Sequence, residues 1–400
     1  MRFSVFSLLG QAFRGNRGWT PHWRDAAPKI DGRPLTVSNG RVFVRSLEAA
    51  MAQQQMGLAD LDSGGAQALD DTYSPSISAN GRFVAFASAA SLLPGANGNT
   101  QIFVRDRQSA TIQRASLGPG GVLGNSGSQL SSSSISADGR FVAFESVASN
   151  LVAGDTNICP PLVGNCPDVF VRDRQLGTTE RVSVGPGGLQ ANGESLNASI
   201  SADGRFVAFE SFADNLLGVS DGNTWSNVFV HDRQTGTNEQ IDAYSGSSTP
   251  AQAGATNPRI SADGRFVAFV SSDGNLSGTP TFATTIYVRD RETLATDVVV
   301  VDSHISTGDT LAISSDGRFV AYSLQNVLYL RDRLNGTTEV VSVAADGQPA
   351  SGAGASISAD GRLIAFESIA SNLIGNGADT NGLDDVFVRD RLAGITERVS

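Results

Sequence analysis

The residues best suited to chemistry are oxygen ligands grouped in loops. The segment Asp379-Thr-Asn-Gly-Leu-Asp-Asp385 places carboxylate and amide oxygens at alternate positions ahead of a glycine turn, and this spacing lets one short loop wrap a hard cation. Weaker versions of the arrangement occur twice more in the chain. The candidate calcium ligands are Asp155, Asn157, Asp168, Asp221, Asn223, Asp379, Asn381 and Asp385. The same residue types also form Asx turns, in which the side chain accepts nearby backbone amides, so both interpretations stay open.

The two cysteines, Cys159 and Cys166, lie in one proline-rich loop. A disulfide between them would close a short loop and would indicate an oxidising compartment. Two free thiols or half of a metal site are the alternatives. A metal site lacks obvious further ligands, because the only histidines are His22, His231 and His304.

Two glycine-rich patterns resemble catalytic motifs without their context. Gly218-Val-Ser-Asp-Gly222 fits the spacing of a serine-hydrolase elbow, but that elbow requires a strand, a turn and a helix, with a histidine to take the proton. Gly118-Pro-Gly-Gly121 and Gly185-Pro-Gly-Gly188 resemble phosphate loops, yet their recurrence indicates turns. We therefore predict no catalytic residue, and a protein that is not an enzyme.

The elements that position these loops come from a repeated phrase. Its clearest copy is Ile135-Ser-Ala-Asp-Gly-Arg-Phe-Val-Ala-Phe144, in which Asp-Gly between apolar runs predicts a tight hairpin. A second phrase, Val169-Phe-Val-Arg-Asp-Arg174, predicts a third strand, and the alternation in Thr179–Val184 predicts a half-exposed fourth. The copies of the first phrase begin at Ile77, Ile135, Ile200, Ile260, Ile313 and Ile357. Four antiparallel strands in each unit predict an all-β fold, a six-bladed β-propeller of four-stranded blades.

The repeats also predict the domain boundaries. Residues 1–33 form a leader or extension, residues 34–70 a hairpin plus a short helix over Leu47–Met56, and residues 71–400 the propeller. The predicted blades are 71–126, 127–191, 192–251, 252–305, 306–348 and 349–400. Val42-Phe-Val-Arg45 echoes the third strand, so residues 34–70 could be a partial seventh blade or a cap that closes the ring.

The repeated Arg-Asp-Arg is interpreted as structural. Its Asp would accept turn amides and its arginines would bridge blades, because a scaffold repeats its residues whereas a site tends to break the symmetry. A ring of surface arginines that binds a ligand is the alternative.

Two resemblances follow from these residues. Ser-Ala-Asp-Gly-Arg-Phe-Val-Ala-Phe resembles the TolB-like, Trp-Asp-type propeller repeat, which usually has Pro in place of the Ala. That resemblance implies a module for protein interaction in the bacterial envelope. Residues 1–30, with Gly15-Asn-Arg-Gly-Trp19 and His22-Trp-Arg24, resemble the N-terminus of the sarcosine oxidase β subunit, a flavoprotein. The glycine motif that would cradle the dinucleotide does not follow, so FAD is not predicted.

Charge restricts the partners. The net charge is −11 and Lys29 is the only lysine, so we expect no nucleic-acid ligand. No stretch has the length of a membrane span. We also expect the protein to be a monomer. The leading hypothesis is a non-enzymatic scaffold that binds a protein or polysaccharide through irregular loops, in the periplasm or outside the cell, with possible calcium. The alternative functions are a propeller enzyme with a site in its central channel and a partner of sarcosine oxidase. A cytoplasmic location is the alternative to export, because Phe3–Leu9 makes only a short signal segment.

Overall fold

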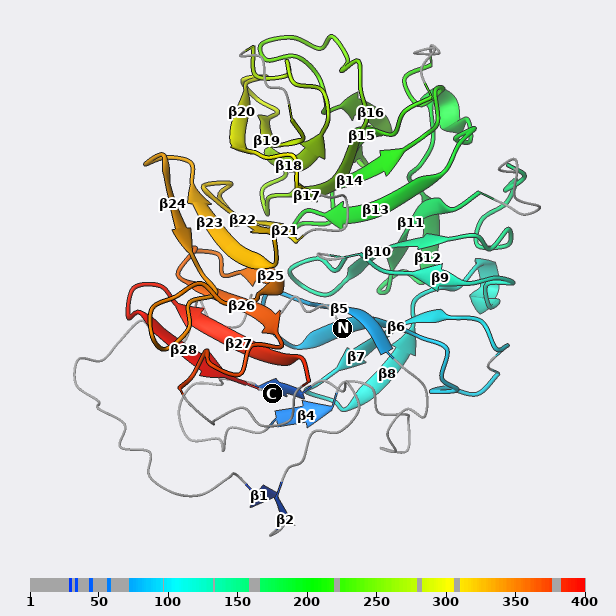
Figure 1. The fold of residues 1–400 in the computed structure, drawn as a ribbon. Helices are drawn as coiled ribbons and strands as arrows, with labels where there is room; N and C mark the ends of the chain where they lie inside the picture. Colours follow the sequence, from blue (N-terminus) through cyan, green and yellow to red (C-terminus); the bar gives the residue numbers. More distant parts are fainter. Residues whose placement is uncertain are drawn as a thin grey trace.

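The computed structural model describes most of the chain from Thr72 onward and four short pieces before it. The described residues are 29–30, 33–34, 43–45, 56–58, 72–95, 97–131, 134–157, 166–218, 224–278, 283–305, 310–375 and 383–399. Over these residues the chain forms six four-stranded antiparallel sheets, arranged as a ring (Figure 1). The predicted six-bladed β-propeller is confirmed.

Each blade uses four consecutive strands, from the channel outward. Blade 1 contains β5 (Thr72–Ile77), β6 (Phe83–Ser88), β7 (Gln101–Asp106) and β8 (Thr111–Arg114). Blade 2 contains β9 (Ser128–Gln129), β10 (Phe141–Ser146), β11 (Asp168–Asp173) and β12 (Thr178–Arg181). Blade 3 contains β13 (Ser195–Ile200), β14 (Phe206–Ser211), β15 (Asn227–Asp232) and β16 (Thr237–Gln240).

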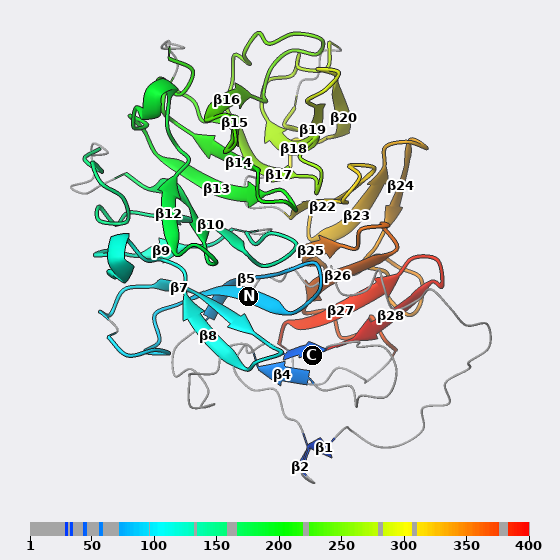
Figure 2. The same ribbon diagram turned by 180° about the vertical axis from the view of Figure 1, so that it is seen from behind.

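The second half of the ring repeats this order, and the reverse view shows the red last blade closing toward the blue and cyan first blade (Figure 2). Blade 4 contains β17 (Ala255–Ile260), β18 (Phe266–Ser271), β19 (Thr285–Asp290) and β20 (Thr296–Val301). Blade 5 contains β21 (Leu311–Ile313), β22 (Phe319–Leu324), β23 (Val327–Asp332) and β24 (Thr337–Val340). Blade 6 contains β25 (Ala353–Ile357), β26 (Leu363–Ser368), β27 (Asp385–Asp390) and β28 (Ile395–Arg398).

The Ser-Ala-Asp-Gly-Arg phrase forms the turn between the first and second strands of each blade. In blade 2 the Ser136 hydroxyl donates to the Asp138 carboxylate over 2.7 Å and accepts the Phe141 amide over 2.9 Å. The same carboxylate accepts the Arg140 amide over 2.9 Å. Gly139 has φ +75°, which a glycine adopts without strain. The Ser and Asp of the phrase therefore satisfy particular backbone amides of the turn, and its Gly supplies the left-handed conformation.

The Ala of the phrase joins neighbouring blades. The Ala79 amide donates to the Ala137 carbonyl, the Ala137 amide to the Ala202 carbonyl, and the Ala202 amide to the Ala262 carbonyl, each over 2.9 Å. A proline has no amide hydrogen and could not make these bonds. The departure from the usual Ser-Pro-Asp-Gly thus contributes a chain of backbone bonds from blade 1 to blade 4.

The core of each blade is a pair of aromatic side chains from its second and third strands. Phe144 and Phe170 of blade 2 are stacked with ring centroids 5.7 Å apart, and the other five blades repeat the pair. Small alanines at the preceding position, such as Ala143, are fully buried where blades approach each other. The two-faced burial predicted for these strands is confirmed.

Two sequence expectations differ from the structure. The fourth strand of blade 2 ends at Arg181 rather than Val184, because the Ser183 hydroxyl, not a backbone carbonyl, accepts the Val169 amide. The predicted helix over Leu47–Met56 is wrong at its end, since Met56 begins β4 (Met56–Leu58), which pairs with β3 (Phe43–Arg45). The rest of that segment lies outside the described residues.

The remaining elements are short. β1 (Lys29–Ile30) pairs with β2 (Arg33–Pro34). The 3-10 turns η2 (Pro119–Gly121) and η3 (Pro186–Gly188) confirm that the Gly-Pro-Gly-Gly segments are turns between blades. The domain boundaries, the partial seventh blade and the resemblance of residues 1–30 to sarcosine oxidase stay predictions, because most of residues 1–71 lies outside the described part of the chain.

Candidate functional site

The antiparallel strands give the ring two different faces. The turn face carries the Asp-Gly hairpins and the turns that follow Arg-Asp-Arg, for example 137–139 and 174–177. The loop face carries the connections between second and third strands and those between blades, for example 147–157 and 182–194. The predicted site residues that the structure describes, Asp155, Asn157, Cys166, Asp168 and Asp385, lie on or beside connections of the loop face.

On the turn face, Arg-Asp-Arg has the structural role predicted for it. The Asp173 carboxylate accepts the Gln175 and Leu176 amides over 2.9 and 3.0 Å, and its other oxygen forms a 2.6 Å ion pair with Arg140. The pKa of Asp173 is held below its ordinary value by these bonds, against the opposing effect of burial. The aspartate thereby joins two turns of one blade.

The last arginine of the triplet reaches the preceding blade. The Arg174 guanidinium lies 4.6 Å from the centre of the Phe83 ring, donates to the Gly139 carbonyl and contacts Gln113. Arg82 covers the same ring from its own blade at 4.8 Å. Phe83, Phe141, Phe206 and Phe319 each lie between two arginines in this way, as does Phe266.

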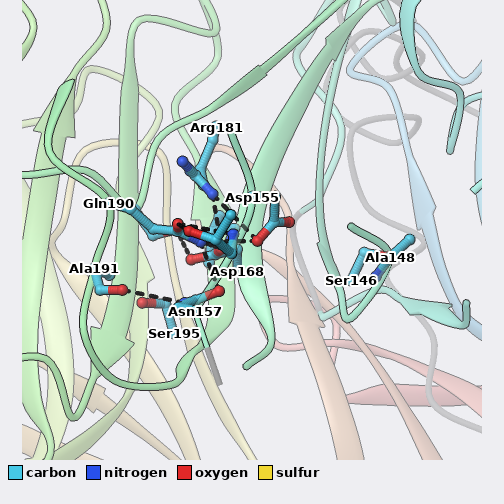
Figure 3. Close-up of polar contacts among 12 residues, drawn as sticks. Ser146, Ala148, Asp155, Asn157, Asp168, Arg181, Gln190, Ala191 and Ser195 are labelled. Carbon is cyan, nitrogen blue, oxygen red and sulfur yellow. Dashed lines mark hydrogen bonds and ion pairs between the residues drawn. The ribbon is translucent and has the colours of Figure 1, made fainter. Parts of the chain in front are cut away.

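On the loop face, three of the predicted ligands of blade 2 come together (Figure 3). Oxygens of Asp155, Asn157 and Asp168 lie 2.8, 2.6 and 3.2 Å from one atom, Nε2 of Gln190. Arg181 Nη1 lies 3.4 Å from Asp155 and 3.2 Å from Asp168. An amide nitrogen and a guanidinium therefore occupy the region toward which these oxygens point.

The cluster is buried, which changes its electrostatics. Asp168 is fully inaccessible, and burial raises its pKa to about 6 in spite of bonds from Ser183 and Gln190 and the charge of Arg181. Asn157 also donates to the Ala191 carbonyl over 3.1 Å. The contacts tie the second-to-third-strand loop of blade 2 to the segment that leads into blade 3.

The structure describes only two of the remaining predicted residues, Asp385 and Cys166. Asp385 is buried and lies 3.3 Å from Arg398, which repeats the Asp168–Arg181 pair in blade 6. Cys166 is buried. The other predicted residues, Asp221, Asn223, Asp379, Asn381 and Cys159, lie outside the described residues. The calcium site and the disulfide therefore stay predictions, and no cluster of three or more His, Cys, Asp or Glu suited to a metal occurs among the residues that are described.

Sequence reasoning missed Arg181 and Gln190 as partners of the acidic loop. Gln190 follows η3 and carries no motif, and only the packing of the blade connection against the loop brings it to Asp155. Arg181 could have been found, because an arginine followed by Val-Ser ends the fourth strand in the two blades that have Asp at the start of the third.

The central channel contains a cavity of about 150 Å³. Its lining residues are Ser76, Ile77, Ala79, Ile135, Ala137, Ile200, Ala202, Ile260, Ala262, Leu311, Ala312, Ile313, Ser315, Ala355, Ser356 and Ile357. The sequence predicted a channel lined mostly by Ser and Ile; the described lining contains Ile and Ala in equal numbers and fewer Ser. Across this described lining no acid or base faces the cavity.

Comparison with known proteins supports the architecture. The chain is a β-propeller. A structure from a study of two prolyl endopeptidases is 12% identical, with a TM-score of 0.54, over 90% of this chain and 46% of that one. TolB from Acinetobacter baumannii is 18% identical, with a TM-score of 0.40, over 67% of this chain and 53% of that one. An oligogalacturonate lyase in complex with manganese is 15% identical, with a TM-score of 0.49, over 81% and 77%.

The likeness to the prolyl endopeptidase structure shows the fold alone, because the identity is low, and nothing is argued from the other two structures. The chain spans about half the length of the TolB and prolyl endopeptidase chains. No protein family and no curated protein sequence matches the chain. Within the described residues, we find no helix with the length and apolar character needed to cross a bilayer.

Proposed function

We propose that this protein is a non-catalytic propeller scaffold whose loop face binds a protein or a polysaccharide, in the bacterial envelope or outside the cell. The observation that carries the proposal is a difference between the two faces in how their residues are used. The constant residues of the turn face are engaged in bonds within and between blades, whereas the loop face varies from blade to blade. Loops held on a rigid frame are where recognition usually occurs.

Two features support binding at the loop face rather than chemistry in the channel. The described channel lining is apolar or carries serine hydroxyls, and general acid–base catalysis needs titratable groups near the substrate. The loop face also exposes large apolar side chains, including Leu189 at 55% and Trp225 at 51%. Tryptophan in particular is enriched among the residues that contribute most to binding energy.

The test compares matched substitutions on the two faces. Leu189→Ser and Trp225→Ser change the loop face, while Leu176→Ser and Leu392→Ser remove leucines of the turn face that are 68% and 80% exposed. Binding is measured on a polysaccharide array and by cross-linking to envelope proteins. We expect the loop-face variants to weaken binding at least tenfold, or about 1.4 kcal/mol, and the turn-face variants to retain it. The reverse pattern, or equal losses on both faces, would contradict the proposal.

The proposed location outside the cytoplasm depends on the cysteines. We propose that Cys159 and Cys166 are joined, which would close the loop before β11 in an oxidising compartment. Alkylation of the unfolded, unreduced protein followed by mass spectrometry should leave both thiols unlabelled. Labelling of both would remove this support for export and favour the cytoplasmic alternative.

Calcium binding is a second proposal, favoured by the contacts of Gln190. Three oxygens surround one amide nitrogen that has only two hydrogens, so one of the three contacts has no hydrogen bond. A half-turn of the amide would present an oxygen to the same point, and calcium prefers such oxygen ligands. We expect calcium to raise the melting temperature of chelator-treated protein, and Asp168→Asn to abolish the increase. An unchanged melting temperature would contradict it.

A further inference from the structure

Two buried glutamates reach from one blade to the next near the loop-face ends of their second strands. Glu145 is the fifth residue of β10 in blade 2, and Glu210 holds the same position of β14 in blade 3. Each side chain is only 6% exposed. Neither glutamate has a part in the turn-face contacts or in the loop-face cluster of Asp168.

The backbone that they contact is irregular. The ladder between β13 and β14 shifts register between Leu196 and Ser199, and the ladder between β17 and β18 shifts between Thr256 and Arg259. Each bulge contains an asparagine with positive φ, Asn197 at 55° and Asn257 at 57°. A bulge removes backbone groups from the ladder, which leaves amides available to other acceptors.

The glutamates accept these amides. Glu145 Oε1 accepts the Ala198 amide of blade 3 over 2.8 Å and the Ser131 hydroxyl over 2.8 Å. Glu210 Oε2 accepts the Asn257 amide of blade 4 over 2.7 Å. Two successive blade junctions are therefore held by a carboxyl group on the first blade and a bulge on the second.

The junction between blades 5 and 6 provides a natural comparison. Its bulge contains Gly354, with φ 61°, and the Gly354 amide donates to the Thr310 hydroxyl over 2.7 Å. A threonine hydroxyl does not titrate, so the Gly354 amide has an acceptor that is not titratable, although the Glu367 side chain of β26 packs against Gly354. The repeat thus uses one bulge with two kinds of acceptor.

We propose that Glu145 and Glu210 form pH-dependent latches between blades 2, 3 and 4, so that these junctions are held more tightly in mildly acidic than in mildly basic solution. The reason is the cost of burying an ionised carboxylate, which protonation removes. This proposal is independent of the proposed binding function and holds even if the loop face binds no ligand.

The electrostatic surroundings set the direction of the effect. Burial raises the pKa of Glu145 to about 7, and burial also raises the pKa of Glu210. The charged groups that face Glu145 are Arg259 of β17, which opposes the rise, and Glu210 of β14, which adds to it. Arg259 also opposes the rise in the pKa of Glu210. The other polar neighbours of Glu210, Asn197 and Asn257, are neutral. Stability from such raised groups is complete below the unfolded pKa and is lost as pH rises through the folded one.

Hydrogen exchange at the bulges tests the latches directly. Peptides that cover 195–200, 255–260 and 353–357 report on the three bulges, after correction for the intrinsic effect of pH on exchange. In the wild type we expect protection of 195–200 to be about tenfold higher near pH 6 than near pH 8, if opening exposes Glu145 to water. Protection of 255–260 should change in the same direction, and protection of 353–357 should change less, because the acceptor of its bulge amide is a hydroxyl.

Single substitutions separate the two latches. Glu145→Gln should remove the pH effect at 195–200 and leave it at 255–260, and Glu210→Gln should do the reverse. A pH effect that survives in the matching variant, or protection that is higher at basic pH, would overturn the proposal. Should either variant fail to fold, infrared spectra of the folded wild type decide, because the carbonyl band of a protonated carboxyl group must then disappear between about pH 6 and pH 8. Its absence at pH 6 would also overturn the proposal.

Discussion

The turn face and the loop face use the same residue types in opposite ways. On the turn face, Asp232 accepts a hydrogen bond from Arg205, whose side chain is partly exposed, and this bond lowers the pKa of Asp232 to about 2. On the loop face, Asp168 also contacts an arginine, yet burial raises its pKa to about 6. The comparison teaches that an Asp–Arg pair in a repeat is defined by its burial and its hydrogen bonds, not by its sequence.

The glycines of the two faces also differ in how closely they are packed. Gly204 of the turn face and Gly187 of the loop face have nearly equal φ, 74° and 70°. A Cβ atom on Gly204 would lie 2.2 Å from Cδ2 of Phe141 in the preceding blade, whereas a Cβ atom on Gly187 would meet nothing within 4 Å. One glycine is therefore required by the junction between blades, and the other only by its own backbone.

The largest effect that we expect comes from this pair of glycines. Gly204→Ala should lower the free energy of unfolding by roughly 3 kcal/mol, because it adds the cost of left-handed backbone to a clash that the packed junction resists. Gly187→Ala should cost only about 1 kcal/mol, from the backbone alone. Urea unfolding of both variants measures the difference. Equal losses would show that the junction between blades 2 and 3 yields easily and that the two faces are equally tolerant.

A smaller effect is expected for the arginines that join blades. Arg233 covers Phe141 at 4.3 Å, pairs with Glu180 and donates to the Gly204 carbonyl. Arg233→Met should lower the free energy of unfolding by about 2 kcal/mol, since it removes a cation–π contact and a charged hydrogen bond between blades.

The matched control is an arginine whose contacts stay within its own turn. Arg389 donates to the Gly394 carbonyl and to the Thr396 hydroxyl of its own turn, so Arg389→Met should cost about 0.5 kcal/mol or less. Chemical denaturation followed by fluorescence gives both values. A loss at Arg389 as large as that at Arg233 would argue against bridging between blades as the source of the stability.

The smallest effect is a pH dependence of opposite sign on the two faces. Stability from Asp232, whose pKa is lowered, is present above about pH 4 and is lost as pH falls toward 2. Stability from Asp168, whose pKa is raised, is lost as pH rises from about 4 to 6. The free energy of unfolding of the wild type should therefore fall toward that of Asp232→Asn in acid. As pH rises, the free energy of unfolding of Asp168→Asn should increase relative to that of the wild type.

Urea midpoints measured in chelator across this pH range check both curves. Parallel curves for Asp168→Asn and the wild type would show that Arg181 and Gln190 compensate fully for the burial of Asp168. Such a result would remove the electrostatic difference between the faces.

Much of the fold followed from the repeat. Asp-Gly between apolar runs, with Asn80-Gly81 in its place in blade 1, predicted the hairpins of the channel strands and the number of blades. Arg-Asp-Arg was predicted to accept turn amides and to bridge blades, as Asp173 and Arg174 do. These features were predictable because their causes are local, within a turn, or are repeated at a fixed distance along the chain.

The candidate site was less predictable. The sequence grouped Asp155, Asn157 and Asp168 as oxygen ligands, and the structure brings these three together. The sequence did not supply Gln190, which meets them only because the connection to blade 3 packs on the loop. Nor did it supply the contact of Glu145 with the Ala198 amide, since nothing in the β10 segment distinguishes an inward acid from an outward one.

By itself, the sequence determined the six-bladed ring, the composition of each turn and the acidic character of the loops. These depend on backbone conformation and apolar pattern, which act over a few residues. Only the tertiary structure decided which acids are buried, which arginine or amide faces each of them, and why Ala rather than Pro precedes the Asp-Gly turns. Those outcomes depend on contacts between blades, and burial there changes the free energy of a charge far more than any neighbour in the sequence.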